Sequence, residues 1–265
     1  MGGVVEITRE GGLAIVTLNR PRKKNAWTLE MFDALAAASA RLANDEGLRA
    51  VILTGAGGCF SAGLDTAMFA EFATRLDETR AEMLAPPEGR AANRFQQPVV
   101  GWQALGVPVI AAIEGVAFGA GLQLALAADF RIAAPDARLS AMEAKWGLIP
   151  DMGITCSLPR LVRADVAKDL IMTARIVEAS EALALGLVSA LAGDPLSQAW
   201  TLAETLATRS PEALRAAKRL VDEGWGSDAT GTLALEARLQ ADLIGSANQV
   251  EAVMANLQKR PPNFR

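Results

Sequence analysis

Residues 107–151 read VPVIAAIEGVAFGAGLQLALAADFRIAAPDARLSAMEAKWGLIPD, and the rest of the chain is organised around them. The opening Val-Pro-Val-Ile is apolar and β-branched. Because proline is tolerated in a strand only near its start, a buried strand is predicted here. A turn follows at Glu114-Gly115, and a helix then begins through Gly119-Ala120-Gly121. Small residues at that helix start let a backbone N–H group point at a ligand without a bulky side chain in the way.

Two carboxylates, Glu143 and Asp151, follow this helix start. A helix N-terminus carries unpaired N–H groups and the positive end of a dipole, so it suits an anion or a developing oxyanion. A carboxylate buried beside the apolar residues between these acids would have a raised pKa and could exchange protons near neutral pH. On spacing alone, a turn-forming aspartate and a surface glutamate are slightly favoured. Together, the strand, the helix start and the acids predict catalysis on a carbonyl compound.

The composition excludes several kinds of catalyst. The 265-residue chain contains no histidine and no tyrosine. The lack of histidine excludes Ser-His-Asp and Cys-His catalysis and any zinc site that uses histidine. Proton transfer must therefore fall to Asp, Glu, Lys, Cys or water. The net charge is only −4, which gives no reason to expect nucleic acid or an anionic membrane as a partner.

The cysteines and the N-terminal residues favour a cytoplasmic protein. Cys59 and Cys156 match no metal-ligand spacing, so no metal site is expected, and two lone thiols fit a reducing cytosol. The N-terminal MGGVVEITREGG lacks a basic region followed by an apolar core, so no signal peptide is predicted. The apolar run over residues 107–134 is interrupted by charges such as Glu114 and Asp129, which favours a buried core over a membrane span.

The hydrophobic patterns predict an α/β body followed by a helical tail. Two strand-like segments within residues 4–18 flank a Glu-Gly-Gly turn and are typical of a hairpin, and residues 51–54 form a buried-strand candidate. Residues 66–98 have a weaker pattern, which we interpret as helix fragments around a mobile substrate-side lid. We therefore divide the chain into a core over residues 1–195 and a helical C-terminal region over residues 196–265.

Two glycine-bounded turns lead from a strand into a helix. One surrounds Ala62-Gly63-Leu64 and the other surrounds Gly119-Ala120-Gly121. Either turn alone is a common way to end a strand. Together they could supply two N–H donors to one carbonyl oxygen, which is the arrangement that stabilises an enolate or a tetrahedral oxyanion.

Several separated motifs resemble, in their order, those of the crotonase superfamily, which is the enoyl-CoA hydratase/isomerase family. The resemblance covers essentially the full length of the chain, and so many motifs make a more specific match than one glycine pattern. The matching pieces are Leu18-Asn19-Arg20-Pro21 with Asn25-Ala26, Phe60-Ser61-Ala62-Gly63-Leu64-Asp65, Gly115-Val116-Ala117-Phe118-Gly119-Ala120-Gly121 with Ala128-Asp129, and Ala184-Leu185-Gly186-Leu187-Val188.

The resemblance implies a repeated ββα spiral core and a helical trimerisation tail, which would give a homotrimer or a hexamer made of two trimers. It implies an acyl-CoA thioester as the substrate, with coenzyme A part of that substrate and no separate cofactor. By position, the backbone N–H groups of Leu64 and Ala120 would form the oxyanion hole. The family usually has glycine at the second of these positions, and alanine keeps the N–H while narrowing the approach.

The resemblance also implies how the substrate is held. The basic loop that contains Arg22 and Lys24 is placed where the phosphates of coenzyme A are met, although any single exposed charge is otherwise a solvated surface residue. The other positions carried over as substrate-binding are Ala26, Ala62, Asp65 and Gln123.

The acids depart from the usual pattern of a hydratase in this family, which has two glutamates. The first would fall at Gln123, and a neutral amide can orient a water or a substrate group but cannot act as a general base. Glu143 matches the second. Asp151 matches a position at which the dienoyl-CoA isomerase branch carries an aspartate, although that branch also has an acid where this chain has Gln123. We therefore favour double-bond isomerisation, with Glu143 and Asp151 as an acid/base pair on opposite sides of the substrate.

Two other functions stay open. One is enoyl-CoA hydration, with Glu143 as the principal acid/base and Gln123 holding the water. The other is a CoA-binding trimer with little catalysis, since Ala120 and Gln123 both depart from the commonest pattern of the family.

Overall fold

The main sheet begins with an antiparallel hairpin. The computed structural model describes residues 2–264, and in it β1 (Val5–Glu10) pairs with β2 (Leu13–Leu18) along its whole length. Gly11 adopts a φ of +55° in the connecting turn, a conformation that glycine reaches without a steric cost. The hairpin predicted from the sequence is confirmed.

Four further strands extend this sheet in parallel. They are β3 (Ala50–Gly55), β4 (Val109–Ile113), β6 (Phe130–Ala133) and β9 (Ala190–Leu191), and the order across the sheet is β1-β2-β3-β4-β6-β9. Every residue of β3 and β4 is buried, since helices cover both faces of the sheet. This explains why the two strands have continuous apolar sequences instead of alternating ones. The predicted α/β class is confirmed.

A smaller sheet stands beside the first and contains β5 (Val116–Phe118), β7 (Arg138–Ser140) and β8 (Val177–Glu178) in that order. Only Glu114 and Gly115 separate β4 from β5, and Gly115 has a φ of +61°. The chain therefore passes from one sheet to the other within a single turn. The short strand β5 was not predicted from the sequence.

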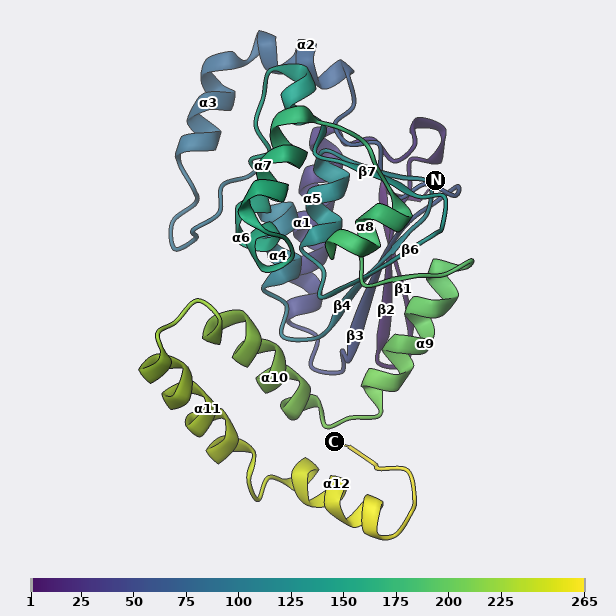
Figure 1. The fold of residues 1–265 in the computed structure, drawn as a ribbon, viewed down its shortest axis with the longest axis vertical. Helices are drawn as coiled ribbons and strands as arrows, with labels where there is room; N and C mark the ends of the chain where they lie inside the picture. Colours follow the sequence, from purple (N-terminus) through teal and green to yellow (C-terminus); the bar gives the residue numbers. More distant parts are fainter. Residues whose placement is uncertain (1, 265) are drawn as a thin grey trace.

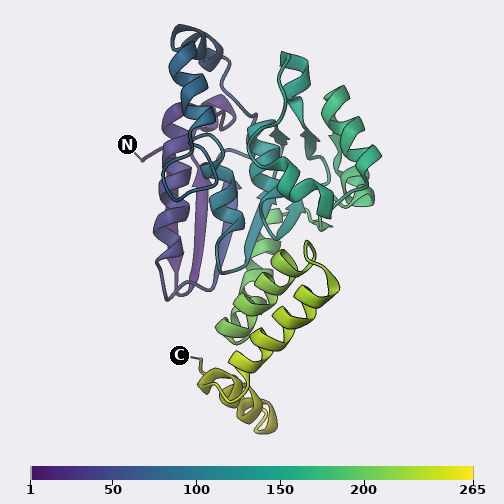
Figure 2. The same ribbon diagram turned by 90° about the vertical axis from the view of Figure 1, so that its left-hand side faces the viewer.

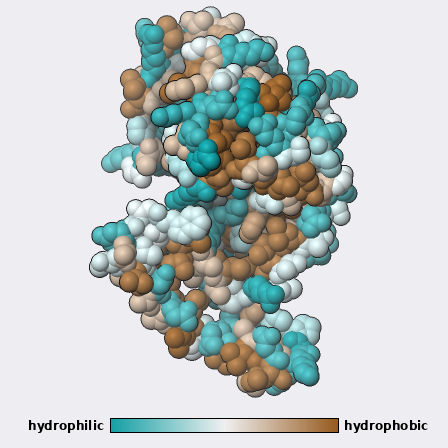
Figure 3. Space-filling view, viewed as in Figure 1, coloured by the Kyte–Doolittle hydropathy of each residue, from teal (hydrophilic) through white to brown (hydrophobic). Residues whose placement is uncertain are grey.

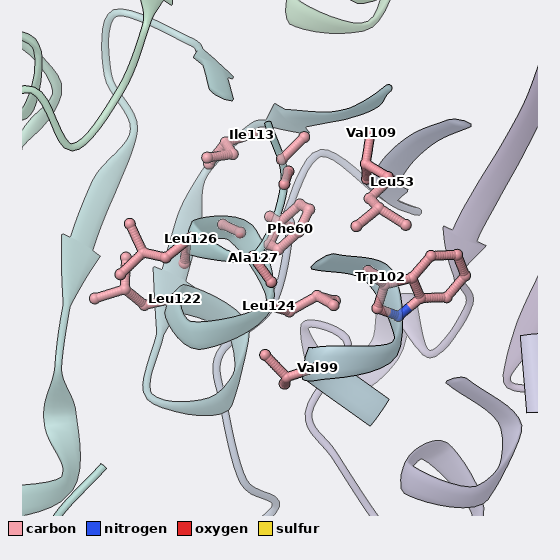
Figure 4. Close-up of a cluster of buried hydrophobic side chains, with 14 of the residues drawn as sticks. Leu53, Phe60, Val99, Trp102, Val109, Ile113, Leu122, Leu124, Leu126 and Ala127 are labelled. Atoms are coloured by element: carbon pink, nitrogen blue, oxygen red, sulfur yellow. The ribbon is translucent and has the colours of Figure 1, made fainter. Parts of the chain in front are cut away.

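One face of the main sheet packs against α1 (Leu29–Ala43), α4 (Gln97–Gln103) and α5 (Ala120–Leu126), which share one large hydrophobic core. Figure 4 shows Trp102 of α4 and Leu124 of α5 among the buried side chains of this core. The remaining helices of the body are η1 (Pro21–Lys23), α2 (Ala67–Thr74), α3 (Leu76–Leu84), η2 (Met142–Trp146), α6 (Ile154–Ser157), η3 (Leu158–Arg160), α7 (Ala164–Thr173) and α8 (Ala179–Leu185).

The opposite face of the main sheet is covered by α9 (Pro195–Ala207), whose buried Ala199 and Ala203 lie against β3 and β4. The boundary predicted from the sequence, after residue 195, places nearly all of α9 in the C-terminal region. The contacts of α9 are nevertheless with the strands of the core. The helices that stand away from the sheet are α10 (Pro211–Gly224), α11 (Ala229–Leu243) and α12 (Ala247–Leu257). Figures 1 and 2 show these three helices as an arm that extends from the body.

The arm exposes large apolar side chains. Trp225 is 71% exposed and Leu257 is 74% exposed, and Val221, Leu233 and Ile244 are also open to solvent. Within residues 2–264, no helix combines the length and the hydropathy that crossing a membrane requires.

A largely buried ion pair joins the arm to the body. Lys218 of α10 donates to the Oδ2 of Asp129 at 2.9 Å and to the carbonyl oxygen of Val107 at 3.1 Å. The same carboxylate oxygen accepts the backbone N–H of Val109, the first residue of β4, at 2.7 Å. Burial raises the pKa of Asp129, and the charge of Lys218 opposes that rise.

We expect Lys218→Met to destabilise the protein, because it leaves the carboxylate of Asp129 without its cation. The free energy of unfolding should fall by about 2–3 kcal/mol, below the usual cost of breaking a fully buried pair because Asp129 is partly exposed. Arg219→Met is the matched control. It removes the surface pair with Glu223, in which both side chains are about half exposed, and should cost less than about 1 kcal/mol. Equal denaturation curves for the two variants would contradict the prediction.

Candidate active site

The two glycine turns predicted from the sequence meet in the structure. Gly63 has a φ of +86° and Gly119 has a φ of +52°, conformations that side chains rarely adopt. A Cβ on Gly63 would lie 2.6 Å from the carbonyl oxygen of Phe118, and a Cβ on Gly119 would lie 3.9 Å from the Cα of Gly63. The turns can approach this closely because neither residue has a side chain.

Each turn presents one free backbone donor. Ala120 is the first residue of α5, and Leu64 follows Gly63 directly. Among residues 2–264, no acceptor receives the N–H of Leu64 or of Ala120. The first N–H groups of a helix have no partner within the helix, which leaves them free for a ligand. The pair therefore fits the predicted oxyanion hole.

The first turn is held in place by Asn25 and Ser61, neither of which was predicted as a site residue. Asn25 is fully buried and donates from Nδ2 to the carbonyl oxygens of Ala56 at 3.0 Å and Cys59 at 2.6 Å. The hydroxyl of Ser61 donates to the carbonyl oxygen of Asn25 at 2.9 Å and accepts the N–H of Gly63 at 3.2 Å. Both residues lie in motifs that carry the resemblance, Asn25-Ala26 and Phe60-Ser61-Ala62-Gly63-Leu64-Asp65, and these motifs were the signal in the sequence for this support.

Glu143 lies on η2 beside the second turn, and its Oε1 would be 3.5 Å from a Cβ on Gly119. This oxygen accepts a hydrogen bond of 2.7 Å from Nε2 of Gln123. The other oxygen, Oε2, is buried and has no partner within residues 2–264. Burial raises the pKa of Glu143, the hydrogen bond from Gln123 opposes that rise, and the charge of Asp151 adds to it. A carboxyl with these properties can take up and release a proton at the site.

Gln123 is 1% exposed and projects from α5 between Glu143 and the chain after Pro150. Its Oε1 accepts the backbone N–H of Met152 at 2.8 Å. Because the carbonyl of the amide must face this N–H, its NH₂ group faces Glu143. Gln123 therefore orients the acid without competing for a proton.

Asp151 follows Pro150 and lines a groove of about 1300 Å³ between the body and α10, where Figure 3 shows the surface hollowed. Partial removal of water from around the carboxyl of Asp151 raises the pKa of this group. The structure thus brings Asp151 close enough for its charge to act on Glu143, with the two acids on separate segments. The charge of Asp151 therefore adds to the raised pKa of Glu143.

The predicted substrate-binding residues include exposed charges and residues that are held within the first turn. Arg22 and Lys24 are exposed and form no ion pair within the described part of the chain. Ala26 is buried, and Ala62 donates its N–H to the carbonyl oxygen of Lys24 at 2.8 Å. The carboxylate of Asp65 forms an ion pair with the guanidinium of Arg20, at 3.1 Å. The N–H of Ala67 and the Arg20 guanidinium lower the pKa of Asp65, which suits a role in holding the loop.

No cluster of three or more Cys, Asp or Glu side chains that could hold a metal ion occurs within residues 2–264. Cys59 is buried in the first turn, and Cys156 is exposed in the groove beside Asp151. Within the described residues, no hydrogen bond joins either cysteine to the N–H of Leu64 or of Ala120.

The sequence of the chain is similar to one family model and to several proteins of known name. The family model described as enoyl-CoA hydratase/isomerase matches residues 8–265. The mouse protein named methylglutaconyl-CoA hydratase, mitochondrial, is 33% identical over 261 residues, which cover 96% of this chain and 80% of the mouse protein. The short-chain-enoyl-CoA hydratase of Clostridium acetobutylicum is 33% identical over 259 residues, which cover 97% of this chain and 95% of that protein.

Solved structures agree in fold over nearly the whole chain. An enoyl-CoA hydratase from Polaromonas sp. JS666 superposes with a TM-score of 0.88 at 32% identity, covering 98% of this chain and 99% of the other. An enoyl-CoA hydratase from Bacillus anthracis also superposes with a TM-score of 0.88, at 31% identity, covering 98% of each chain. These similarities confirm the resemblance stated from the sequence motifs and the fold that it implies.

Proposed function

This chain belongs to the enoyl-CoA hydratase/isomerase family, and we propose that it catalyses the hydration of a 2-enoyl-CoA thioester. The relatives named above are hydratases, which favours hydration over the isomerisation that the acid pattern led us to expect. The observation that carries the proposal is the buried, unpaired Oε2 of Glu143 beside two free N–H donors. An acid/base group and an oxyanion hole are the two parts that hydration needs.

The thioester oxygen accepts the N–H groups of Leu64 and Ala120, which draws electron density from the conjugated double bond and leaves C3 electrophilic. A water molecule beside Glu143 gives one proton to Oε2 as its oxygen bonds to C3. The resulting enolate is stabilised by the same two N–H groups. Glu143 then returns the proton to C2, so that one water has added across the double bond and the carboxylate is regenerated.

Gln123 takes the place that a second glutamate has in the usual hydratase pattern. Its NH₂ group holds one oxygen of Glu143, and the second N–H of that group can orient the attacking water. Glu143 is therefore the only carboxyl in this pair, so a single residue both accepts and returns the proton.

Double-bond isomerisation is the second candidate, and Asp151 is the observation that favours it. Its pKa is raised by burial, and its charge contributes to the raised pKa of Glu143. Two such carboxyls on separate segments could remove a proton from one carbon and add a proton to another.

We further propose that the arm mediates assembly into a homotrimer or a hexamer. Its exposed apolar side chains, which include Trp225, Leu233 and Leu257, form the kind of surface that marks a protein interface. A cytoplasmic location is also proposed, and the two free cysteines support it.

Glu143→Gln should lower kcat for crotonyl-CoA by roughly 10²–10⁴-fold, because an amide cannot exchange the proton. The affinity for butyryl-CoA, measured by calorimetry, should stay close to that of the wild type. Glu30→Gln, on the exposed side of α1, is the matched control and should leave both quantities unchanged. A Glu143→Gln variant with undiminished turnover would exclude the proposed acid/base.

Hydration should also weaken as the pH falls, since only ionised Glu143 accepts the proton. Burial raises the pKa of this group, so kcat should decline below a pH that is higher than the ordinary pKa of a glutamate. Gln123→Leu removes a hydrogen bond that favours the ionised form of Glu143. In this variant, the decline of kcat at low pH should therefore begin at a higher pH than in the wild type. A decline of kcat at the same pH in the wild type and in Gln123→Leu would contradict the proposed role of Gln123.

A paired ultraviolet assay separates the two candidate reactions. Crotonyl-CoA should lose its enoyl absorbance, and a 3,5-dienoyl-CoA should show no growth of the conjugated 2,4-dienoyl band. Growth of that band in the wild type, and its loss in Asp151→Asn, would instead establish isomerisation with Asp151 as the second acid.

A further inference from the structure

We propose that Phe69 and Trp146 form an aromatic wall that closes the far end of the acyl site and restricts the enzyme to short acyl groups. The proposal rests on the acyl-CoA site described above and names the class of acyl group that this site accepts. Phe69 lies on α2 and Trp146 is the last residue of η2. Their ring centroids are 5.1 Å apart, and their planes are inclined at 36°.

The two rings come from the two segments that carry the chemistry. Phe69 lies five residues after Leu64, whose N–H belongs to the oxyanion hole, and Trp146 lies three residues after Glu143. In a 3₁₀ helix, side chains three residues apart lie above one another and are separated by about 6 Å along the axis. The indole of Trp146 is therefore on the same side of η2 as the carboxyl of Glu143, one turn further along.

The contact between the rings crosses the space between these segments. An acyl chain held by its carbonyl at the N–H of Leu64 and presenting C3 to Glu143 lies between the same two segments. After C3, the chain meets the rings within roughly 6 Å, which corresponds to about four or five carbon–carbon bonds. Chains of up to about seven carbons fit in front of the wall, whereas a chain of ten carbons needs the rings to part.

Other contacts keep the wall in place. The Nζ of Lys145 lies 5.9 Å from the centroid of the Trp146 ring, within the range of a cation–π interaction. On the other side, Phe72 of α2 packs edge-on against Phe95, with centroids 5.9 Å apart, which ties α2 to the core. Figure 1 shows α2 and α3 at one end of the molecule, outside the layers of the body. The aromatic contacts are thus important for holding α2 against η2.

Trp146 is half exposed, so its indole can be shortened without leaving a cavity in the core. The test measures the affinities of the full-length protein for two saturated thioesters, butyryl-CoA and decanoyl-CoA, by calorimetry. Saturated thioesters are not turned over, so this readout does not depend on whether the enzyme is a hydratase or an isomerase. Hydration of crotonyl-CoA by the same preparations tests the proposed function separately.

Trp146→Ala should raise the affinity for decanoyl-CoA relative to butyryl-CoA by about tenfold or more, since several methylenes gain a place to bind. Trp146→Phe keeps a ring in the wall and should resemble the wild type. Leu183→Ala shortens a partly exposed apolar side chain of α8, away from both rings, and is the matched control, with an unchanged ratio. Phe69→Leu should shift the ratio in the same direction as Trp146→Ala, by a smaller factor.

The proposal is overturned if Trp146→Ala and Phe69→Leu both leave the ratio unchanged. It is also overturned if the affinity for decanoyl-CoA falls in these variants, because the rings would then support long chains instead of excluding them. A wild type that binds decanoyl-CoA more tightly than butyryl-CoA would contradict it without any substitution.

Discussion

The close approach of Gly63 and Gly119 is the constraint on which the site depends. The two turns come from different βα units, and each belongs to a segment that is held by strand-like pairing, including the bridge between Ser61 and Ala117. A side chain on Gly63 would collide with the carbonyl of Phe118, and the turns would have to separate. The donors of the proposed oxyanion hole are backbone groups, so their position is set by this contact rather than by the side chains of Leu64 and Ala120.

The buried Asn25 at the end of the basic loop connects this loop to the first turn. Asn25 has a φ of +53° and accepts the N–H of Arg20 at 2.8 Å, which closes the loop on itself. The same side chain ties the loop to the carbonyl of Cys59 in the first turn. The exposed Arg22 and Lys24 are thereby held beside the first turn, as binding the phosphates of an acyl-CoA substrate would require.

The sequence predicted the features that local patterns encode, and missed those that depend on packing. The hairpin, the buried strands and the tail helices follow from hydrophobic periodicity and turn residues, and the glycine motifs indicated both donors. The hydrogen bond from Gln123 to Glu143 could not be predicted, because α5 and η2 meet only in the folded chain. The contact between Phe69 and Trp146 was hidden for the same reason, since residues 66–98 have no clear period and their helices are held by distant aromatic rings.

The neutral amide at Gln123 changes what the neighbouring acid can do. A carboxylate there would lie about as close to Glu143 as the present amide nitrogen, 2.7 Å away, and two buried like charges at that distance would share one proton. The amide removes this conflict and donates to Glu143, which favours the ionised form. Asp151 acts in the opposite direction, but from a separate segment that borders an open groove. In the proposed mechanism, the amide of Gln123 thus favours the ionised form of Glu143 that acts as the base, whereas the charge of Asp151 raises the pKa of Glu143.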